Sequence, residues 1–227
     1  MLQAWRKVKM NILLLSDIHS NTYTLLTRLP KIVSENDINL CLISGDLTNF
    51  APIRAFQKTM NLVCQILEDR PIVWVPGNCD PRESLEIEKI ECAINAHGRI
   101  VKVEEFKIFG IGGSLKGPFE TNIEFTEEEF NKIISENLTE DFDILLLHEP
   151  PYMTKVDTVY DKHVGSKTIR ALIEEKKPKL VACGHIHESK GIDYIGESII
   201  INPGPFKLGH YVIVSLMDAE VKVVKNV

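Results

Sequence analysis

The sequence predicts an α/β protein in which helices cover the outer faces of two packed β-sheets. Two observations predict this class. Five short apolar runs alternate with segments of helical periodicity, and each run ends in polar residues of kinds that bind metals. The chain then ends in short β-type runs separated by turn residues.

Length and composition favour one globular domain over residues 1–227. Hydrophobic residues make up 44% of the chain and charged residues 26%, which is ordinary for a protein with a real core. No apolar run approaches ~18 residues, so we expect no transmembrane helix. The basic start lacks a signal-peptide pattern. We interpret residues 1–9 as a disordered extension, with Met10 as an alternative start.

The net charge of −6 argues against a broad nucleic-acid-binding or membrane-binding surface. It does not exclude a local positive site. The five cysteines include no CxxC pair. Their odd number and spacing favour reduced thiols and a cytoplasmic protein.

The first half of the chain predicts three strand–helix units. Asn21 or Ser20 is a natural cap for the first helix, and Asp80, Pro81 and Glu83 resemble the start of the third. The expected elements are a strand at 11–15, a helix from about 21, a strand at 40–43, a helix at 52–67, a strand at 72–75 and a helix from about 81.

The second half predicts a second sheet. Two short strands come first, and the glycines at 110, 112 and 113 are expected to close them in a tight turn. A loop of roughly fifteen residues follows the next strand, longer than most connections. The expected elements are strands at 99–103 and 106–111, a helix at 126–138, a strand at 144–147, a helix at 166–176, a strand at 180–183, and β runs at 191–195, 198–201, 211–216 and 221–224.

The polar residues at the strand ends predict a two-metal site. Carboxyl ends of parallel strands meet at one rim, where ligands of open α/β sheets bind. Oxygen and imidazole donors suit Mn, Fe, Zn, Co or Ni. Asp46, after the second strand, is the expected common ligand of two ions. The set is Asp17, His19, Asp46, Asn78, His148, His185 and His187.

The net charge of the predicted site indicates what kind of group binds there. Two divalent ions carry +4, and Asp17 and Asp46 reduce this to +2, or to +1 with a bridging hydroxide. An anionic phosphoryl group suits such a site. Taken alone, each motif is weak: Gly-Asp after a strand is commonly a turn, and a lone His-x-His is often incidental. Their joint occurrence in this order favours the dinuclear site.

The motifs Ser-Asp17-Ile-His19, Gly-Asp46, Gly-Asn78-Cys-Asp, His148 and Gly-His185-Ile-His187 resemble the series of the calcineurin-like metallophosphoesterases. The resemblance implies a four-layer α/β/β/α sandwich of two mixed sheets. It implies hydrolysis of phosphate esters by a metal-bridging hydroxide, with Mn²⁺ a suitable ion in vitro. One ion would take Asp17, His19, Asp46 and His187, and the other Asp46, Asn78, His148 and His185.

Cys79 departs from the family, which usually has histidine after the asparagine. A thiol with a pKa near ~8.5 is a poorer acid than imidazole and carries no positive charge at pH 7. Similar small members with this cysteine act best on activated diesters. We therefore predict a phosphodiesterase with Asp46, Asn78, Cys79 and His148 at the reacting centre. The alternative for Cys79 is a thiol that only fills space.

Two further residues are candidates for contact with a small phosphate-ester substrate. His163 lies in the loop 149–166, interpreted as a substrate-facing lid; the alternative is a solvated loop. Asn49 follows Asp46 closely and is also a common turn former. Competing functions are a phosphomonoesterase or protein phosphatase, and a catalytically weak scaffold for protein partners. A homo-oligomer is possible.

Overall fold

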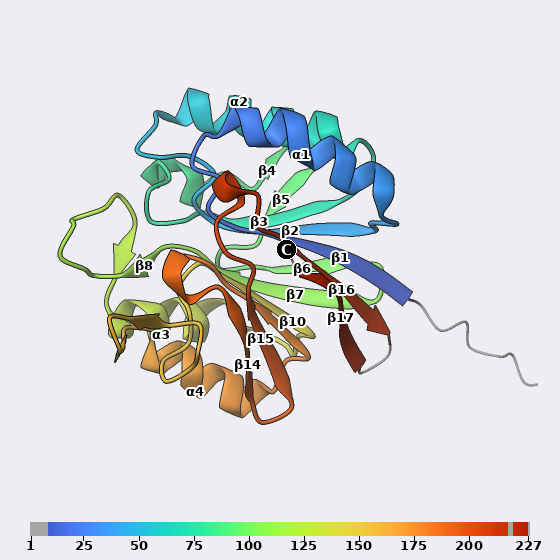
Figure 1. The fold of residues 1–227 in the computed structure, drawn as a ribbon. Coiled ribbons are helices and arrows are strands. Elements are labelled where there is room, and N and C mark those ends of the chain that lie inside the picture. The colour runs from blue at the N-terminus through green and yellow to red at the C-terminus, as the bar shows by residue number, and fades with distance from the viewer. Residues whose placement is uncertain (1–8, 218–219, 227) are drawn as a thin grey trace, which may run out of the picture.

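A computed structural model describes residues 9–217 and 220–226 of the chain, which form two large mixed sheets (Figure 1). The predicted extension at 1–9 falls outside these residues except for Lys9, which begins β1. The seven-stranded sheet runs in the order β17 (Glu220–Asn226), β16 (Val212–Met217), β1 (Lys9–Leu15), β2 (Leu40–Ser44), β3 (Ile72–Val75), β5 (Ala93–Asn95) and β4 (Lys89–Ile90).

The second sheet has six strands and packs face to face against the first. Its order is β14 (Gly191–Ile195), β15 (Ser198–Asn202), β13 (Leu180–Ala182), β10 (Ile144–Leu147), β7 (Phe106–Ile111) and β6 (Ile100–Val103). Two further pairs are small, β8 (Ser114–Leu115) with β9 (Glu124–Phe125), and β11 (Thr158–Val159) with β12 (Lys162–His163).

Helices cover both outer faces of the sheets. In Figure 1, α1 (Thr22–Glu35) and α2 (Ile53–Leu67) lie over the first sheet, and α3 (Glu127–Asn137) and α4 (Lys167–Lys176) lie under the second. Three short 3₁₀ turns complete the described elements: η1 (Arg82–Leu85), η2 (His187–Ser189) and η3 (Phe206–Leu208). The predicted four-layer α/β/β/α sandwich is confirmed.

Alternation along the buried strands separates the layers. Leu13 and Leu15 of β1 belong to the core under α1 and α2, whereas Ile12 and Leu14 belong to the core between the sheets. This period of two is what a strand buried on both faces requires. The outer core of the second sheet, which includes Phe130 of α3, forms a third cluster.

Two helix starts follow their capping signals. Asn21 caps α1 by accepting a hydrogen bond from the Thr24 amide, and Thr126 and Glu129 form a complete capping box at α3. The helix predicted after Asp80 is wrong, because η1 spans four residues and has no side-chain cap. The Asp80 carboxylate instead accepts hydrogen bonds from the Leu47 and Thr48 amides.

The glycines at 110, 112 and 113 do not close the hairpin that the sequence predicted. The turn between β6 and β7 lies at Glu104 and Glu105, while Gly110 is inside β7. A Cβ on Gly112 would lie 2.4 Å from the Pro76 carbonyl oxygen. Because Gly112 has no side chain, the end of β7 can approach the loop after β3. This close contact joins the two sheets at the rim.

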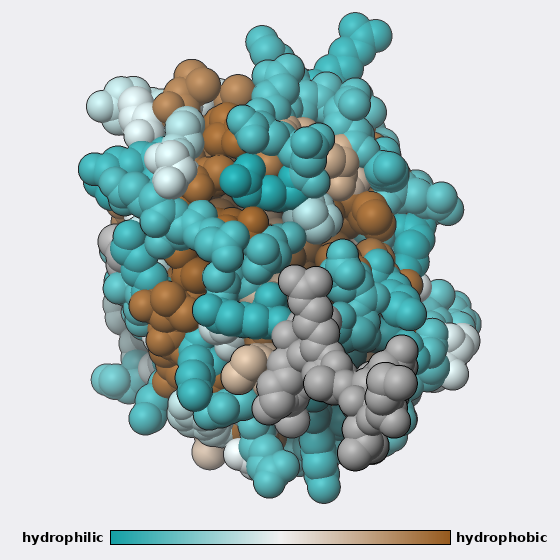
Figure 2. All heavy atoms as spheres, turned by 90° about the vertical axis from the view of Figure 1, so that its right-hand side faces the viewer, coloured by the Kyte–Doolittle hydropathy of each residue, from teal (hydrophilic) through white to brown (hydrophobic). Residues whose placement is uncertain are grey.

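Hydrophilic side chains cover most of the end of the molecule seen in Figure 2, with hydrophobic residues showing between them. Strand β1 starts at this end and runs away from it (Figure 1). Across the described ranges, no helix combines the length and apolar character that a membrane crossing needs.

His97, after β5, gives the fold a specific pH dependence. Its Nδ1 accepts a hydrogen bond from the Gly112 amide at 2.9 Å. Burial lowers the pKa of His97 to about 4, from an ordinary value of 6.5. Between these values the unfolded chain binds more protons than the folded one. The free energy of unfolding therefore falls as the pH drops through this window, by about 2 kcal/mol between pH 7 and pH 5.

A His97→Gln variant should lack this contribution, because glutamine does not titrate. Urea unfolding of both proteins at pH 7 and pH 5 measures it. We expect the wild type to lose about 2 kcal/mol more than the variant between the two pH values. Equal losses would contradict the role of His97.

Candidate metal centre

Seven polar side chains predicted at the strand ends meet at one rim of the sandwich. β1, β2 and β3 run parallel in the first sheet, as do β10 and β13 in the second, so their carboxyl ends lie together. Each of these side chains follows a strand: Asp17 and His19 follow β1, Asp46 follows β2, Asn78 follows β3, His148 follows β10, and His185 and His187 follow β13.

The chain turns sharply where it delivers several of these side chains. Asp17, His19, Asp46 and His185 all have positive φ, between 47° and 66°. Non-glycine residues in this left-handed region cost about 1–2 kcal/mol each. Backbone hydrogen bonds hold them there: the Asp17 amide donates to the Gly45 carbonyl at 3.1 Å, and the His19 amide to the Asp46 carbonyl at 2.9 Å. Such strain concentrates at functional sites.

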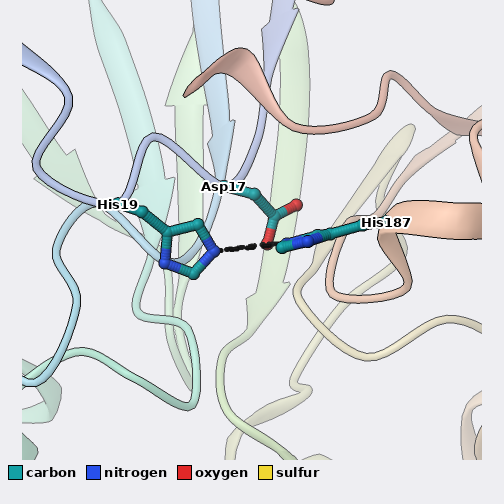
Figure 3. Close-up of side chains that lie close together, drawn as sticks. All are labelled: Asp17, His19 and His187. Atoms are coloured by element: carbon teal, nitrogen blue, oxygen red, sulfur yellow. Dashed lines mark hydrogen bonds and ion pairs between the residues drawn. The ribbon is translucent and has the colours of Figure 1, made fainter. Parts of the chain in front are cut away.

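One half of the cluster joins Asp17, His19 and His187 (Figure 3). The Nε2 atoms of the two histidines lie 3.2 Å apart. Asp17 Oδ1 lies 3.2 Å from His187 Nε2 and 3.8 Å from His19 Nε2. This oxygen is buried and has no hydrogen bond of good geometry. One carboxylate oxygen and two imidazole nitrogens therefore lie close together with too few protons to hydrogen-bond fully with one another. A bound cation would satisfy their lone pairs.

The other half joins His148, Asn78 and His185. His148 Nδ1 donates to the Ser44 carbonyl at 2.7 Å, which fixes the orientation of the ring. Its Nε2 lies 2.8 Å from Asn78 Oδ1. The His185 ring lies beside the His148 ring, with centroids 5.0 Å apart. The second half thus also brings together three side chains of kinds that can coordinate a metal.

Asp46 lies between the halves. Its Oδ2 is 3.6 Å from His19 Nε2, and its Oδ1 is 3.7 Å from His148 Nε2. The Cys79 amide donates to Oδ1 at 2.8 Å and fixes the carboxylate plane. Each oxygen therefore faces one half, as the predicted shared ligand requires.

Protonation states suit cation binding. Burial lowers the pKa of His19, and burial lowers that of His185 to about 3, so both rings are neutral at pH 7. Burial opposes ionisation of Asp17, but its contacts with His187, His148 and the Ser16 hydroxyl outweigh burial and lower the pKa of Asp17. Neutral imidazoles and a carboxylate are the forms that coordinate metals.

Cys79 lies beside this set. Its sulfur, an oxygen of Asp46 and a nitrogen of His19 lie within 4.8 Å of one another. Burial, followed by the charge of Asp46, raises the pKa of the Cys79 thiol above its usual value. At pH 7 the residue is an uncharged thiol.

Two further candidates for substrate contact are His163 and Asn49. A cavity of about 650 Å³ opens beside Asn78, His185 and His187, and neither candidate is among the described residues that line it. His163 Nδ1 instead bonds Asp157 at 2.7 Å, which ties the β11–β12 hairpin together. Asn49 is exposed. Their contact with substrate stays a prediction.

Sequence reasoning missed two buried acids. Asp80 bonds the loops after β2 and β3 together, and burial with the charge of Asp46 raises its pKa to about 7. Glu149 borders the cavity and accepts a hydrogen bond from the Leu115 amide at 2.9 Å. Burial raises the pKa of Glu149 to about 8. For Glu149, the position after His148 was the available signal.

Comparisons with known proteins agree with this geometry. The sequence profile of the calcineurin-like phosphoesterases matches residues 10–189. An uncharacterized protein of Methanocaldococcus jannaschii is 38% identical over 207 residues, which cover 86% of this chain and 88% of that protein. The 3′,5′-cyclic adenosine monophosphate phosphodiesterase CpdA of Escherichia coli K12 is 23% identical over 173 residues, 74% of this chain and 62% of CpdA.

Two solved structures are similar in fold. The crystal structure of a Thermus thermophilus protein has a TM-score of 0.70 at 21% identity and covers 96% of this chain and 99% of that one. Phosphopantetheinyl hydrolase of Mycobacterium tuberculosis has a TM-score of 0.60 at 12% identity, covering 86% of this chain and 89% of that one.

Proposed function

The chain belongs to the calcineurin-like phosphoesterase family, and from this premise we propose that it is a metal-dependent phosphodiesterase. The observation that carries the proposal is the position of Asp46, whose two oxygens face different histidines, His19 at 3.6 Å and His148 at 3.7 Å. A carboxylate between two such groups suits a pair of ions that share a ligand.

The proposed ligand sets follow the two halves of the cluster. Asp17, His19, Asp46 and His187 would hold one divalent ion, and Asp46, Asn78, His148 and His185 the other. Bound there, such ions supply an activated water and neutralise the oxygens of a phosphoryl group. The donors suit Mn, Fe, Zn, Ni or Co, and we propose Mn²⁺ for assays in vitro.

The protein orients the ligand atoms before any ion arrives. Ser44 fixes the tautomer of His148 through its carbonyl, and the Ser16 hydroxyl donates to Asp17 Oδ2 at 2.6 Å. The Cys79 amide holds Asp46. Partners of this kind preserve ligand geometry and usually affect metal affinity when they are removed.

Cys79 underlies the preference for diesters. The position beside His19 and Asp46 holds an uncharged thiol where an imidazole could donate a proton or offset the second negative charge of a monoester. A diester carries one charge less than a monoester dianion and needs less compensation. The likeness to a cyclic nucleotide phosphodiesterase supports the same preference.

Hydrolysis assays test this proposal. Metal-stripped protein given Mn²⁺ should hydrolyse bis-p-nitrophenyl phosphate with a higher kcat/KM than p-nitrophenyl phosphate. Cys79→His should raise the monoester rate by about tenfold or more, because a general acid returns to the site. Cys79→Ser is the matched control and should leave the preference in place. Faster monoester hydrolysis by the wild type, or no gain in Cys79→His, would contradict the proposal.

Other expectations accompany this function. The substrate is proposed to be a small-molecule phosphate ester. The cytoplasmic location, the single domain over 1–227 and the possible homo-oligomer stay predictions.

A further inference from the structure

A cavity of about 650 Å³ adjoins the proposed metal ligands. Asn78, His185 and His187 form one side of it. A phosphate ester bound at these ligands would therefore border the cavity, and its substituent could extend into this space. The walls of the cavity indicate the chemistry of that substituent.

One wall is the loop between β8 and β9, which carries Phe119. Its base is fastened to the ligand loop: the Ile123 amide donates to the Asn78 carbonyl at 3.2 Å, and the Asn122 side chain to the Cys79 carbonyl at 3.5 Å. The Leu115 amide donates to Glu149. The wall is thus positioned by the residues that flank the metal ligands.

Another wall is the β11–β12 hairpin, which carries Tyr160. The Thr158 amide donates to Ser189 Oγ at 3.0 Å, and that hydroxyl donates back to the Thr158 carbonyl at 2.5 Å. Ser189 ends the short turn that begins at His187. Buried Asp157 braces the hairpin by accepting from the Thr154 and Gly165 amides as well as from His163.

Both walls present apolar surface to the cavity. Phe119 is 83% exposed and Tyr160 is 94% exposed, although both are large aromatic side chains. Val164 and Ile186 also line the space. Large aromatics left exposed around a pocket mark a binding surface, and their flat faces favour a planar guest.

The ionisable lining argues against a second anionic group. Within the described ranges, Lys116 is the only lysine or arginine that lines the cavity, against Glu124 and Glu188. Lys116 already pairs with Glu129 at 3.8 Å. A polyphosphate or a nucleic-acid backbone would meet more acid than base here, whereas an uncharged ring would not.

We propose that this cavity binds an uncharged aromatic substituent of the phosphate ester, held against Phe119 and Tyr160. The inference rests on the proposed function, because the phosphoryl group must sit at the metal centre. The ring can belong to a simple aryl alcohol or to a nucleoside, which share a flat apolar face.

Calorimetric titration of the Mn²⁺-loaded protein tests the proposal without relying on turnover. Phenyl phosphate should bind about tenfold more tightly than methyl phosphate, since both offer the same head group and only one offers a ring. In the double variant Phe119→Ala/Tyr160→Ala the two affinities should become nearly equal, with methyl phosphate unchanged. Tyr194→Ala, which removes an exposed tyrosine outside the cavity lining, is the control.

A second pair of ligands identifies the source of the ring. If adenosine 5′-monophosphate binds more tightly than ribose 5-phosphate, the pocket accepts a nucleoside; if only phenyl phosphate gains, it accepts an aryl alcohol. The proposal is overturned if neither ring improves binding, or if the gain survives in the double variant.

The outcomes also separate this inference from the function. If the protein hydrolyses bis-p-nitrophenyl phosphate but binds ligands with a ring no more tightly, the proposed function stands and the inference about the cavity is overturned. If a ring improves affinity but no diester is hydrolysed, the inference stands and the proposed function is overturned. If none of the four ligands binds and bis-p-nitrophenyl phosphate is not hydrolysed, both are overturned.

Discussion

Asp46→Asn should lower kcat/KM for bis-p-nitrophenyl phosphate by about 10³-fold or more. The carboxylate lies between His19 and His148, and its two oxygens face the two halves of the cluster. An amide can offer only one good oxygen ligand and no negative charge, so it cannot serve both halves. We expect this loss to come from removal of the proposed shared ligand and not from unfolding.

Thermal unfolding with and without Mn²⁺ separates these causes. A metal that binds only the folded state raises the Tm of the wild type. In Asp46→Asn that rise should disappear, while the metal-free Tm stays close to the wild-type value because the side chain keeps its shape. Asp69→Asn, an exposed aspartate outside the site, should match the wild type in both measurements. A retained metal-dependent rise with normal activity would refute the role of Asp46.

Gly77→Ala should reduce diester hydrolysis by about 10²-fold although it removes no ligand. A Cβ at position 77 would lie 2.1 Å from Asp46 Oδ1 and 2.2 Å from the Asp46 amide nitrogen. Real atoms do not approach so closely, so either the loop after β3 or Asp46 must move. A displacement near 1 Å at a reacting centre is expected to cost a factor of this size.

The matched control is Gly191→Ala, where the nearest neighbour of a new Cβ is the Ser189 carbonyl oxygen at 3.9 Å. It should keep wild-type activity and metal affinity. The affinity of Gly77→Ala for Mn²⁺, measured by calorimetry, should fall together with its activity. Normal affinity and rate in Gly77→Ala would show that the loop tolerates the methyl group and that the tight approach is unimportant.

The meeting of the predicted site residues at one rim could be predicted because it depends on local pattern and one general rule. Buried strands such as β2 are visible as apolar runs, and parallel strands bring their carboxyl ends to one rim. His148 directly follows such a run, and Asp46 comes two residues after the end of one, so their meeting required no knowledge of distant contacts.

The surroundings of the cluster could not be predicted in the same way. Asp80 resembles a helix cap locally, but its carboxylate bonds the amides of Leu47 and Thr48, more than thirty residues earlier. Tertiary hydrogen bonds overrode the local signal. β8, β9, β11 and β12 contain two residues each, too few for any periodicity, and their pairing decides the shape of the cavity.

Anomalous diffraction from Mn²⁺-soaked crystals tests the central claim most directly. The account predicts two peaks that share Asp46 as a ligand. One should lie among Asp17, His19 and His187, and the other among Asn78, His148 and His185. A single peak, or two peaks that do not both contact Asp46, would contradict the shared-carboxylate centre on which the proposed function depends.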